Sequence, residues 1–460
     1  MDASSGGSFV LDCLIVGAGF GGLTVATQLV RRGHDVMVLE ARDRIGGRVD
    51  NARFSSGELV EQGGQWVFPN HDRMLELIDE AAAATMPANP GKLLVVQQGD
   101  VRAVEQSPDE HSHRTPFAAA DLGQGVLRLR RLAERTVSDP AWAGANTAWL
   151  DQPMERWLTA NLRTPSAQRD LRGALRAVVH GPLSDTTLGD VLTHVRAGVD
   201  MENLIATNGD IGQVRLVDGV LQLAERMAAQ LEGRVRLSTP VVTIDQEDDA
   251  VVVVTSEGEQ IRARTAVLSV PPWLAKDLVW APQLDPWRYE TVQKTPAGAI
   301  IKCHMLFEPP WWRDAGLSGQ MAADDGPVRV TFDTSDPASE RGILMGFFEG
   351  AEAATLTKFS ASMRERVFRD ALVTVFGEQA ATPLEYLDHD WGADPFTKGS
   401  HGAHFAPGLW SVTGQQLGAR FGRVHFAGAE YASKFNGYME GAVRSGTDTA
   451  AQVVMHLHGQ

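Results

Sequence analysis

The stretch from residue 11 to residue 40 constrains the fold of this chain more strongly than any other. It begins with the apolar run LDCLIVG, continues as GFGGLTVATQLVRRGH and ends with a second apolar run, DVMVLE. A short apolar run that ends in glycine is typical of a buried parallel strand. The middle part has apolar residues at helical spacing and ends at Gly33. The stretch therefore predicts a strand, a glycine turn, a helix and a second strand, which together form a βαβ unit.

Three glycines in that turn, Gly17, Gly19 and Gly22, have the GxGxxG spacing. The first allows a tight turn, the second lets a pyrophosphate approach the backbone, and the third lets the helix pack on the strand. Glu40 ends the second strand, at the spacing of a carboxylate that binds ribose hydroxyls and repels the 2′-phosphate of NADP. The glycines could serve the turn alone, but their context and Glu40 favour a dinucleotide site.

Composition excludes several classes of partner. The 460 residues are 43% hydrophobic and 22% charged, as in an ordinary globular protein of more than one domain. The formal net charge of −16 argues against nucleic acid and anionic membranes, both of which attract basic surfaces. Two distant cysteines, Cys13 and Cys303, suit a reducing compartment. We find no secretory signal and no apolar run long enough to span a bilayer, so we expect a cytoplasmic protein.

The rest of the chain changes its hydrophobic period twice. Residues 75 to 200 are predicted to be mainly helical. From about Gly233 the sequence predicts short strands, and residues 296 to 350 predict more strands, including AGAIIKCHMLF. A helix is predicted at 359–377, and the chain returns to strand, turn and helix after residue 423.

Three further stretches carry specific motifs: EARDRIGGR from Glu40, VEQGGQWV at 60–67, and VHFAGAEYASKFNGYMEGAVRSG from Val424. With these, the chain resembles the flavin-containing monoamine oxidase family over nearly its whole length. The resemblance implies FAD as the cofactor and an α/β fold in which a Rossmann-like FAD-binding domain is interleaved with an α+β substrate-binding domain. The FAD-binding domain would comprise 1–75, 212–285 and 395–460, and the substrate-binding domain 76–211 and 286–394.

The resemblance also implies which residues contact the FAD. Besides the glycines of the turn and Glu40, they are Arg42, Gly47, Arg48, Gly64, Gln65, Trp66, Val241, Trp391, Gly428, Glu430, Tyr438 and Met439. The last helix would direct its N-terminus at the flavin edge that gains negative charge on reduction; a plain core helix is the alternative reading. The cysteine that some members link to the flavin corresponds to Ser400, which predicts FAD held without a covalent bond.

Lys302, Tyr438 and His401 are the catalytic candidates that the resemblance implies. The family lysine holds a water near the flavin and assists reoxidation by oxygen, and Lys302 has the matching IKC context. From the residues alone, Lys302 could instead belong to an edge strand with its amine in solvent. Tyr438 matches one ring of the family's aromatic cage. His401 takes the place of the second ring, within KGSHGAHFAPG.

His401 and His404 invite other readings. A metal site needs more ligands than these two, and no neighbouring Cys, Asp or Glu cluster supplies them, so we predict no metal. His404 is most simply a packed loop residue. His401 could flank the substrate, form a hydrogen bond or titrate near neutral pH.

The resemblance implies the activity of an FAD-dependent amine oxidase. Alignment places mostly apolar residues near the substrate: Val178, Leu204, Ile205, Gln213, Val330 and Phe347. They predict an amine with a hydrophobic, aromatic or alicyclic body, which is oxidised to an imine and then to an aldehyde or ketone, while O2 becomes H2O2. A flavin desaturase or dehydrogenase that uses a non-amine substrate or another acceptor, and a non-catalytic FAD-binding partner, are the alternatives. The family often forms homodimers, which this chain could also do.

Overall fold

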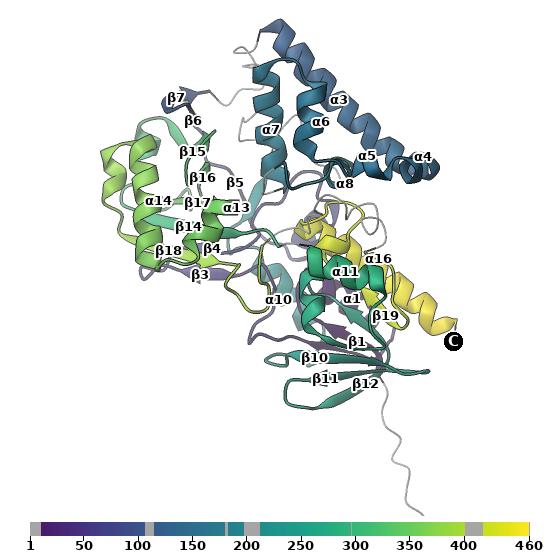
Figure 1. Cartoon of the computed structure of the whole chain (residues 1–460). Helices are drawn as coiled ribbons and strands as arrows, with labels where there is room; N and C mark the ends of the chain where they lie inside the picture. The colour runs from purple at the N-terminus through teal and green to yellow at the C-terminus, as the bar shows by residue number, and fades with distance from the viewer. Residues whose placement is uncertain are drawn as a thin grey trace, which may run out of the picture.

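The computed structural model describes residues 11–105, 115–179, 183–196, 212–295, 297–400 and 417–459. Two large sheets, two small two-stranded sheets and a group of helices make up the described part of the molecule (Figure 1). The predicted βαβ unit is confirmed: β1 (Leu11–Val16), α1 (Phe20–Val30) and β2 (Val36–Leu39) follow each other, and β1 pairs with β2 in parallel.

The first sheet gathers strands from three distant parts of the chain. Its spatial order is β13 (Val279–Ala281), β10 (Val241–Gln246), β11 (Val251–Thr255), β12 (Gln260–Leu268), β1, β2 and β9 (Val235–Arg236), with β19 (Val424–Phe426) also on β12. Its main core lies between the strands and α1, α2 (Asp72–Glu80), α10 (Leu221–Ala229) and α16 (Met439–His458). Helix α16 runs alongside α1.

The second sheet lies beside the first (Figure 1). Its spatial order is β18 (Glu385–Asp390), β14 (Ile300–Phe307), β17 (Gly342–Glu349), β16 (Val330–Asp333), β15 (Leu317–Ala323), β6 (Lys92–Gln97) and β7 (Asp100–Val104). Strand β14 lies inside the sheet and is buried along its whole length, which excludes the edge-strand reading of Lys302.

Alternation along β14 gives the second sheet two different faces. Ile301, Cys303 and Met305 enter a hydrophobic core with α14 (Ala361–Phe376). Leu306, on the other face, packs with Phe54 and Val60 next to the hairpin of β3 (Asn51–Arg53) and β4 (Leu59–Glu61). Lys302 shares the face of Leu306 and is therefore directed at the first part of the chain.

The prediction of mainly helical structure from 75 to 200 is wrong for its first part. Residues 85–104 contain β5 (Thr85–Pro87), β6 and β7, and β5 pairs with β8 (Val214–Leu216). The run KLLVVQ is short and β-branched, and it is followed by a turn at Gly99, whose φ is +86°. These are strand signals within a region whose later part is helical.

Helices fill most of 115–196. They are α3 (Pro116–Ser138), α4 (Pro140–Ala145), α5 (Thr147–Leu150), α6 (Met154–Asn161), α7 (Pro165–Val179) and α8 (Leu188–Arg196), and they enclose a core of their own. Thr115 caps α3, with Pro116 at the first helical position.

The remaining short elements connect these parts. They are α11 (Pro286–Lys294), α12 (Trp311–Asp314), α13 (Gly350–Leu356) and the 3₁₀ turns η1 (Pro272–Asp277), η2 (Glu378–Ala381) and η3 (Ala429–Tyr431). The strands of the first sheet lie at 11–39, 235–281 and 424–426, whereas those of the second lie between 92 and 390. The domain boundaries at 75, 211, 285 and 394 remain predictions.

Candidate active site

The turn between β1 and α1 has the geometry of a phosphate cradle. Gly17 has a φ of +105°, and a Cβ on Gly22 would lie 2.0 Å from the carbonyl oxygen of Gly17. At Gly19, in contrast, a Cβ would meet nothing nearer than 3.9 Å. Helix α1 has no side-chain cap and no acidic residue in its first turn. Its free amides therefore remain available to an anion.

Glu40 fixes this turn from the neighbouring strand. Its Oε2 accepts a hydrogen bond from Ala18 N at 2.7 Å, and its Oε1 accepts one from Arg42 N at 3.0 Å. The Arg42 guanidinium pairs with Asp394, at 2.6 Å between Nη2 and Oδ1. The Arg42 pairing lowers the pKa of the partly buried Asp394, while burial opposes it.

A second arginine joins the two ends of the chain. Arg48 forms a two-pronged ion pair with the buried Glu430, at 2.6 and 2.8 Å, and it also donates to the carbonyl oxygen of Ser400. Glu430 belongs to the turn η3 after β19, which begins at Gly428 with a φ of +142°. Gly47, which precedes Arg48 in the sequence, has a φ of +62° and faces Gly19.

The segment from Gly63 to Trp66 passes close to Arg48 and to Met439 of α16. A Cβ on Gly63 would sit 1.9 Å from the Arg48 carbonyl oxygen, and one on Gly64 would sit 2.8 Å from Met439 Sδ. Only glycine permits this close approach of backbone to its neighbours. Trp66 stacks at a tilt on Phe332, with 5.6 Å between the ring centroids.

Lys302 reaches this segment from β14. Its Nζ donates to Gly63 O at 2.9 Å and to Gln65 Oε1. It also lies 5.9 Å from the centroid of Phe347, its partner in the register of β14 and β17. Burial lowers the pKa of the Lys302 ammonium, and the charge of Glu61 opposes that effect.

Three charged or titratable residues near Lys302 were missed from the sequence. Glu61, Arg215 and His304 are all buried, and Glu61 and Arg215 act on Lys302 through their charges. Burial holds the pKa of His304 well below its usual range, so its imidazole is neutral. The signal that could have found them is polar residues within otherwise apolar strands, as in VEQ, QVRLV and IIKCHML.

Tyr438 precedes α16 among aromatic side chains. Its ring meets those of Phe68 and His71 edge to face, at centroid distances of 6.4 and 5.7 Å. Burial raises the pKa of Tyr438 and lowers that of His71 to about 4, so both side chains are neutral at pH 7. Tyr438 is also the N-cap residue of α16 and makes no side-chain cap, so the first amides of the helix are left for another acceptor.

The other predicted site residues are placed as follows. Trp391 Nε1 donates to Gln62 O at 2.9 Å, and Val241 begins β10. Gln213 is buried next to β8, and Val330 begins β16. His401, Leu204 and Ile205 lie outside the described residues, as does the side chain of Val178 in α7.

The described residues fit a flavin dinucleotide. The turn at Gly17–Gly22 admits a pyrophosphate, and two helices present uncapped N-termini. Among the described residues, Gln65 Nε2 is a buried donor without a hydrogen-bond partner, which an acceptor on the cofactor would complete.

Comparison with known proteins decides the family. The model of the family "Flavin containing amine oxidoreductase" matches residues 20–454. The chain belongs to this family. A Mycobacterium tuberculosis (strain ATCC 25618 / H37Rv) relative that bears the name flavin-containing monoamine oxidase AofH is 33% identical over 455 residues, which cover 98% of each chain. An L-amino acid dehydrogenase of Synechocystis sp. is 29% identical over 97% of this chain and 95% of its own.

Two solved structures of amine oxidases share the fold. Putrescine oxidase bound to putrescine superimposes with a TM-score of 0.89 at 26% identity, covering 97% of this chain and 99% of that one. Cyclohexylamine oxidase from Brevibacterium oxydans has a TM-score of 0.87 at 27% identity, covering 98% and 100%. The chain is therefore a flavin-containing amine oxidoreductase with the fold of these oxidases, as the resemblance predicted.

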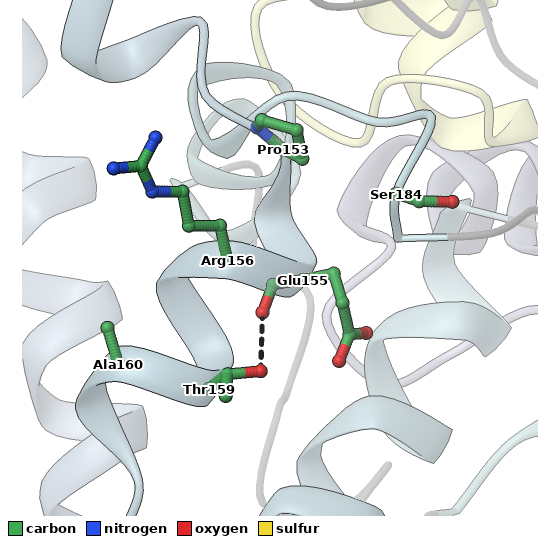
Figure 2. Close-up of a pocket in the computed structure, with 6 residues that line it drawn as sticks. All are labelled: Pro153, Glu155, Arg156, Thr159, Ala160 and Ser184. Carbon is green, nitrogen blue, oxygen red and sulfur yellow. Dashed lines mark hydrogen bonds between the residues drawn. The ribbon is translucent and has the colours of Figure 1, made fainter.

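A surface depression lies on the helical part of the protein, next to α6. Figure 2 shows the six residues around it: Pro153, Glu155, Arg156, Thr159, Ala160 and Ser184. Its volume is about 520 Å³, and the Thr159 hydroxyl donates to the Glu155 carbonyl oxygen at 2.9 Å. It is an open depression along α6, and Lys302 and the residues around it are not among its lining residues.

Within the described ranges, no three or more His, Cys, Asp or Glu side chains gather where they could hold a metal ion. Of the helices in the same ranges, none has the length and apolar character needed to cross a membrane.

Proposed function

We propose that this amine oxidoreductase is an oxidase that converts an amine with a hydrophobic body into an imine, which water turns into an aldehyde or ketone. O2 is the proposed electron acceptor and H2O2 the second product. The observation that carries the proposal is Lys302, which is buried inside the second sheet and bonded to the backbone of Gly63. Burial of an amine is unfavourable, so an apolar residue at this position would serve the stability of the fold better. The presence of lysine there therefore favours a functional role.

FAD is the proposed cofactor, and it would be held without a covalent bond because Ser400 stands where a linking cysteine would be required. Bound FAD would supply the acceptor for the two electrons and the hydrogen removed from the carbon next to nitrogen. The turn at Gly17–Gly22 would hold its pyrophosphate, and Glu40 its ribose. Arg48 and Glu430 would fix the two chain segments on either side of it.

The side chains near Lys302 would exclude water from the substrate. Phe347 shares the sheet face of Lys302, and the register of β16 and β17 places Phe332 and Val330 on the same face. With Trp66 against Phe332, they form an apolar surface. Such a surface lowers the pKa of a bound ammonium and so supplies the neutral amine that the reaction requires.

An aromatic or alicyclic substrate suits this surface better than a polyamine. A polyamine would need acidic residues near the substrate, and Asp324 is a candidate for that role. Asp324 is exposed, however, and it accepts a hydrogen bond from Gln98 N. Tyr438 would contribute one ring beside the amine. His401 would contribute the other, and this remains a proposal.

A dehydrogenase is the second candidate, because a relative of similar coverage bears the name L-amino acid dehydrogenase. Such an enzyme would pass electrons from the flavin to an acceptor other than O2.

The deciding experiment is anaerobic titration of the flavin absorbance with phenethylamine, cyclohexylamine, a nicotine-type cyclic amine and putrescine. We expect one of the hydrophobic amines to bleach the flavin, and air to restore it within seconds with release of H2O2. Bleaching that air fails to reverse quickly would favour the dehydrogenase. A flavin that no amine bleaches would contradict both proposals.

Lys302→Met separates the two half-reactions. We expect this variant to be bleached by amine but reoxidised by air about 100-fold more slowly, because a preorganised charge near the reacting oxygen is lost. Lys294→Met is the matched control, since Lys294 is exposed and its ion pair in the described part of the chain is with Glu290 of its own helix.

A further inference from the structure

Four polar side chains from three strands meet beside the Gly63–Trp66 segment. Glu61 ends β4, Arg215 lies in β8, and Lys302 and His304 lie in β14. Their exposed fractions are 5%, 6%, 2% and 1%, respectively. Charges buried this completely are unfavourable unless they balance one another.

Within the described residues, Lys302 forms no hydrogen bond to an anion. Its two acceptors, Gly63 O and Gln65 Oε1, are neutral. Glu61 lies near Lys302 in the fold, because Val60 packs with Leu306 of β14 while Gly63 accepts the hydrogen bond of Lys302. The charge of Glu61 favours the Lys302 ammonium, whereas burial raises the pKa of Glu61 itself to about 7 and the charge of Lys302 opposes that rise. Glu61 itself is held in place by Val220 N, which donates to its Oε1 at 2.7 Å. Neutral oxygens therefore position the Lys302 amine, and a separate carboxylate favours its protonated form.

Arg215 competes with Lys302 for that anion. Its guanidinium donates to the carbonyl oxygens of Thr334 and Ser335 at 2.8 and 3.2 Å and lies 5.5 Å from the Trp66 ring centroid. A guanidinium keeps its charge at all physiological pH values. The charge of Glu61 thus acts on both cations, while Asp333 and Asp336 also stabilise the Arg215 charge. The permanent charge of Arg215 disfavours the protonated form of Lys302.

The other groups that face Lys302 do not change this balance. Phe347 on β17 is apolar. His304 on β14 and His389, the register partner on β18, both have pKa values lowered mainly by burial, so both are neutral at pH 7. Besides burial, the charge on Lys302 therefore depends on Glu61 and Arg215.

We propose that Glu61 is a positioning residue that keeps Lys302 an ammonium beside the flavin, and that Arg215 sets the upper pH limit at which it does so. This inference rests on the proposed function, in which Lys302 serves the reaction with O2. Conversion of O2 to H2O2 takes two electrons from the reduced cofactor and two protons, one from the cofactor and one from solvent. Lys302 keeps its proton throughout, because its role is to stabilise the negative charge that oxygen gains.

The direct test is the titration of Lys302 by NMR in the flavin-loaded protein. The sequence has only seven lysines, so ¹³Cε-labelled lysine gives a resolvable spectrum, and Lys302→Met assigns the signal. We expect Glu61→Gln, which keeps an acceptor for Val220 N, to lower the pKa of Lys302 by about one unit or more. Arg215→Gln should raise it, and Glu61→Asp should restore a value near that of the unaltered protein.

Glu58→Gln is the matched control. Glu58 lies on the same hairpin but pairs with Arg341 at the surface, so its loss should leave the Lys302 titration unchanged. A Lys302 pKa that is unaffected by both Glu61→Gln and Arg215→Gln, or that moves in the same direction in both, would overturn the proposal. The opposite signs make the test independent of whether either single variant loses stability.

A second readout separates this inference from the amine oxidase proposal. The flavin is photoreduced without any amine and mixed with O2 over a range of pH. We expect reoxidation to slow as pH rises through the pKa of Lys302, and the transition to move down in Glu61→Gln and up in Arg215→Gln. If these shifts occur and no amine bleaches the flavin, the inference holds and the amine oxidase proposal fails. Profiles that coincide would refute the inference whatever the substrate.

Discussion

Two glycines of one turn are constrained by different things. Gly22 has no room for a Cβ within the protein itself, because Gly17 O would be 2.0 Å away. Gly19 has φ −79° and free space, so the fold alone does not require glycine there. We propose that the ligand requires Gly19, because its pyrophosphate would approach the backbone at that point.

This difference predicts opposite outcomes for two alanine substitutions. Gly22→Ala should lower the free energy of unfolding of the flavin-free protein by about 1–3 kcal/mol, because the turn is overpacked. Gly19→Ala should leave that free energy unchanged within about 0.5 kcal/mol and weaken FAD binding at least tenfold. Denaturant unfolding and flavin titration measure the two effects. Equal losses of stability in both variants would contradict this assignment.

Ser400 carries a prediction about the flavin attachment. Because its side chain has no thiol, precipitation of the protein with acid should leave all of the yellow colour in the supernatant. Colour retained in the washed pellet would show a covalent bond and would identify another attachment residue.

At the scale of elements, α2 and α16 are joined by a single carboxylate. Glu440, in the first turn of α16 and fully buried, accepts hydrogen bonds from Met74 N at 2.9 Å and Arg73 N at 3.2 Å, which are first-turn amides of α2. It also pairs with Arg444 of its own helix. One side chain thus caps a neighbouring helix while it stabilises its own N-terminus.

Glu440→Gln should therefore lower the free energy of unfolding by about 2 kcal/mol, since charge-assisted hydrogen bonds to buried amides are weakened and Arg444 loses its buried partner. Glu76→Gln, on the exposed side of α2, removes a carboxylate that pairs with Arg73 in solvent and should change stability by less than about 0.5 kcal/mol. Thermal and denaturant melts of the two variants provide the comparison.

The elements that could be predicted from the sequence are those whose signal is local. The βαβ unit follows from apolar periods and glycines, and the strand that carries Lys302 follows from the apolar run IIKCHMLF, while the role of Lys302 stays a prediction. The strands at 85–104 were hidden in a stretch that is helical further on. Glu61, Arg215 and His304 could not be brought together, because their sequence positions are far apart and only the packing of two sheets joins them.

At the scale of the whole molecule, buried histidines link stability to pH. Burial lowers the pKa of His71 and of His425 to about 4, and His425 shares a hydrogen bond of 3.0 Å with His456. In the unfolded chain a histidine titrates near pH 6.5. Between these values the unfolded state binds more protons than the folded state, so stability is fully present above about pH 6.5 and falls as pH decreases toward 4.

His425→Gln tests this linkage through the slope of the unfolding free energy against pH. Each such histidine contributes up to about 1.4 kcal/mol of lost stability per pH unit in that window. We expect a plot of unfolding free energy against pH to be shallower in His425→Gln by roughly this amount between pH 6 and pH 4.5, whatever the variant's stability at pH 8. An unchanged slope would show that His425 takes up its proton in the folded protein.

The strand order of the first sheet also dictates when the protein can be completed during its synthesis. Strand β12 pairs on one side with β1, which is translated before it, and at its Ala266–Leu268 end on the other side with β19, which is translated long after it. A ribosome adds about 5–20 residues per second, so β1 waits on the order of tens of seconds for β19. Until β19 is made, the end of β12 lacks this neighbour, and Arg48 has no Glu430 to meet. The proposed flavin site is therefore finished only after Glu430 has been added, and a chain stalled before that point carries the βαβ unit with the site still open.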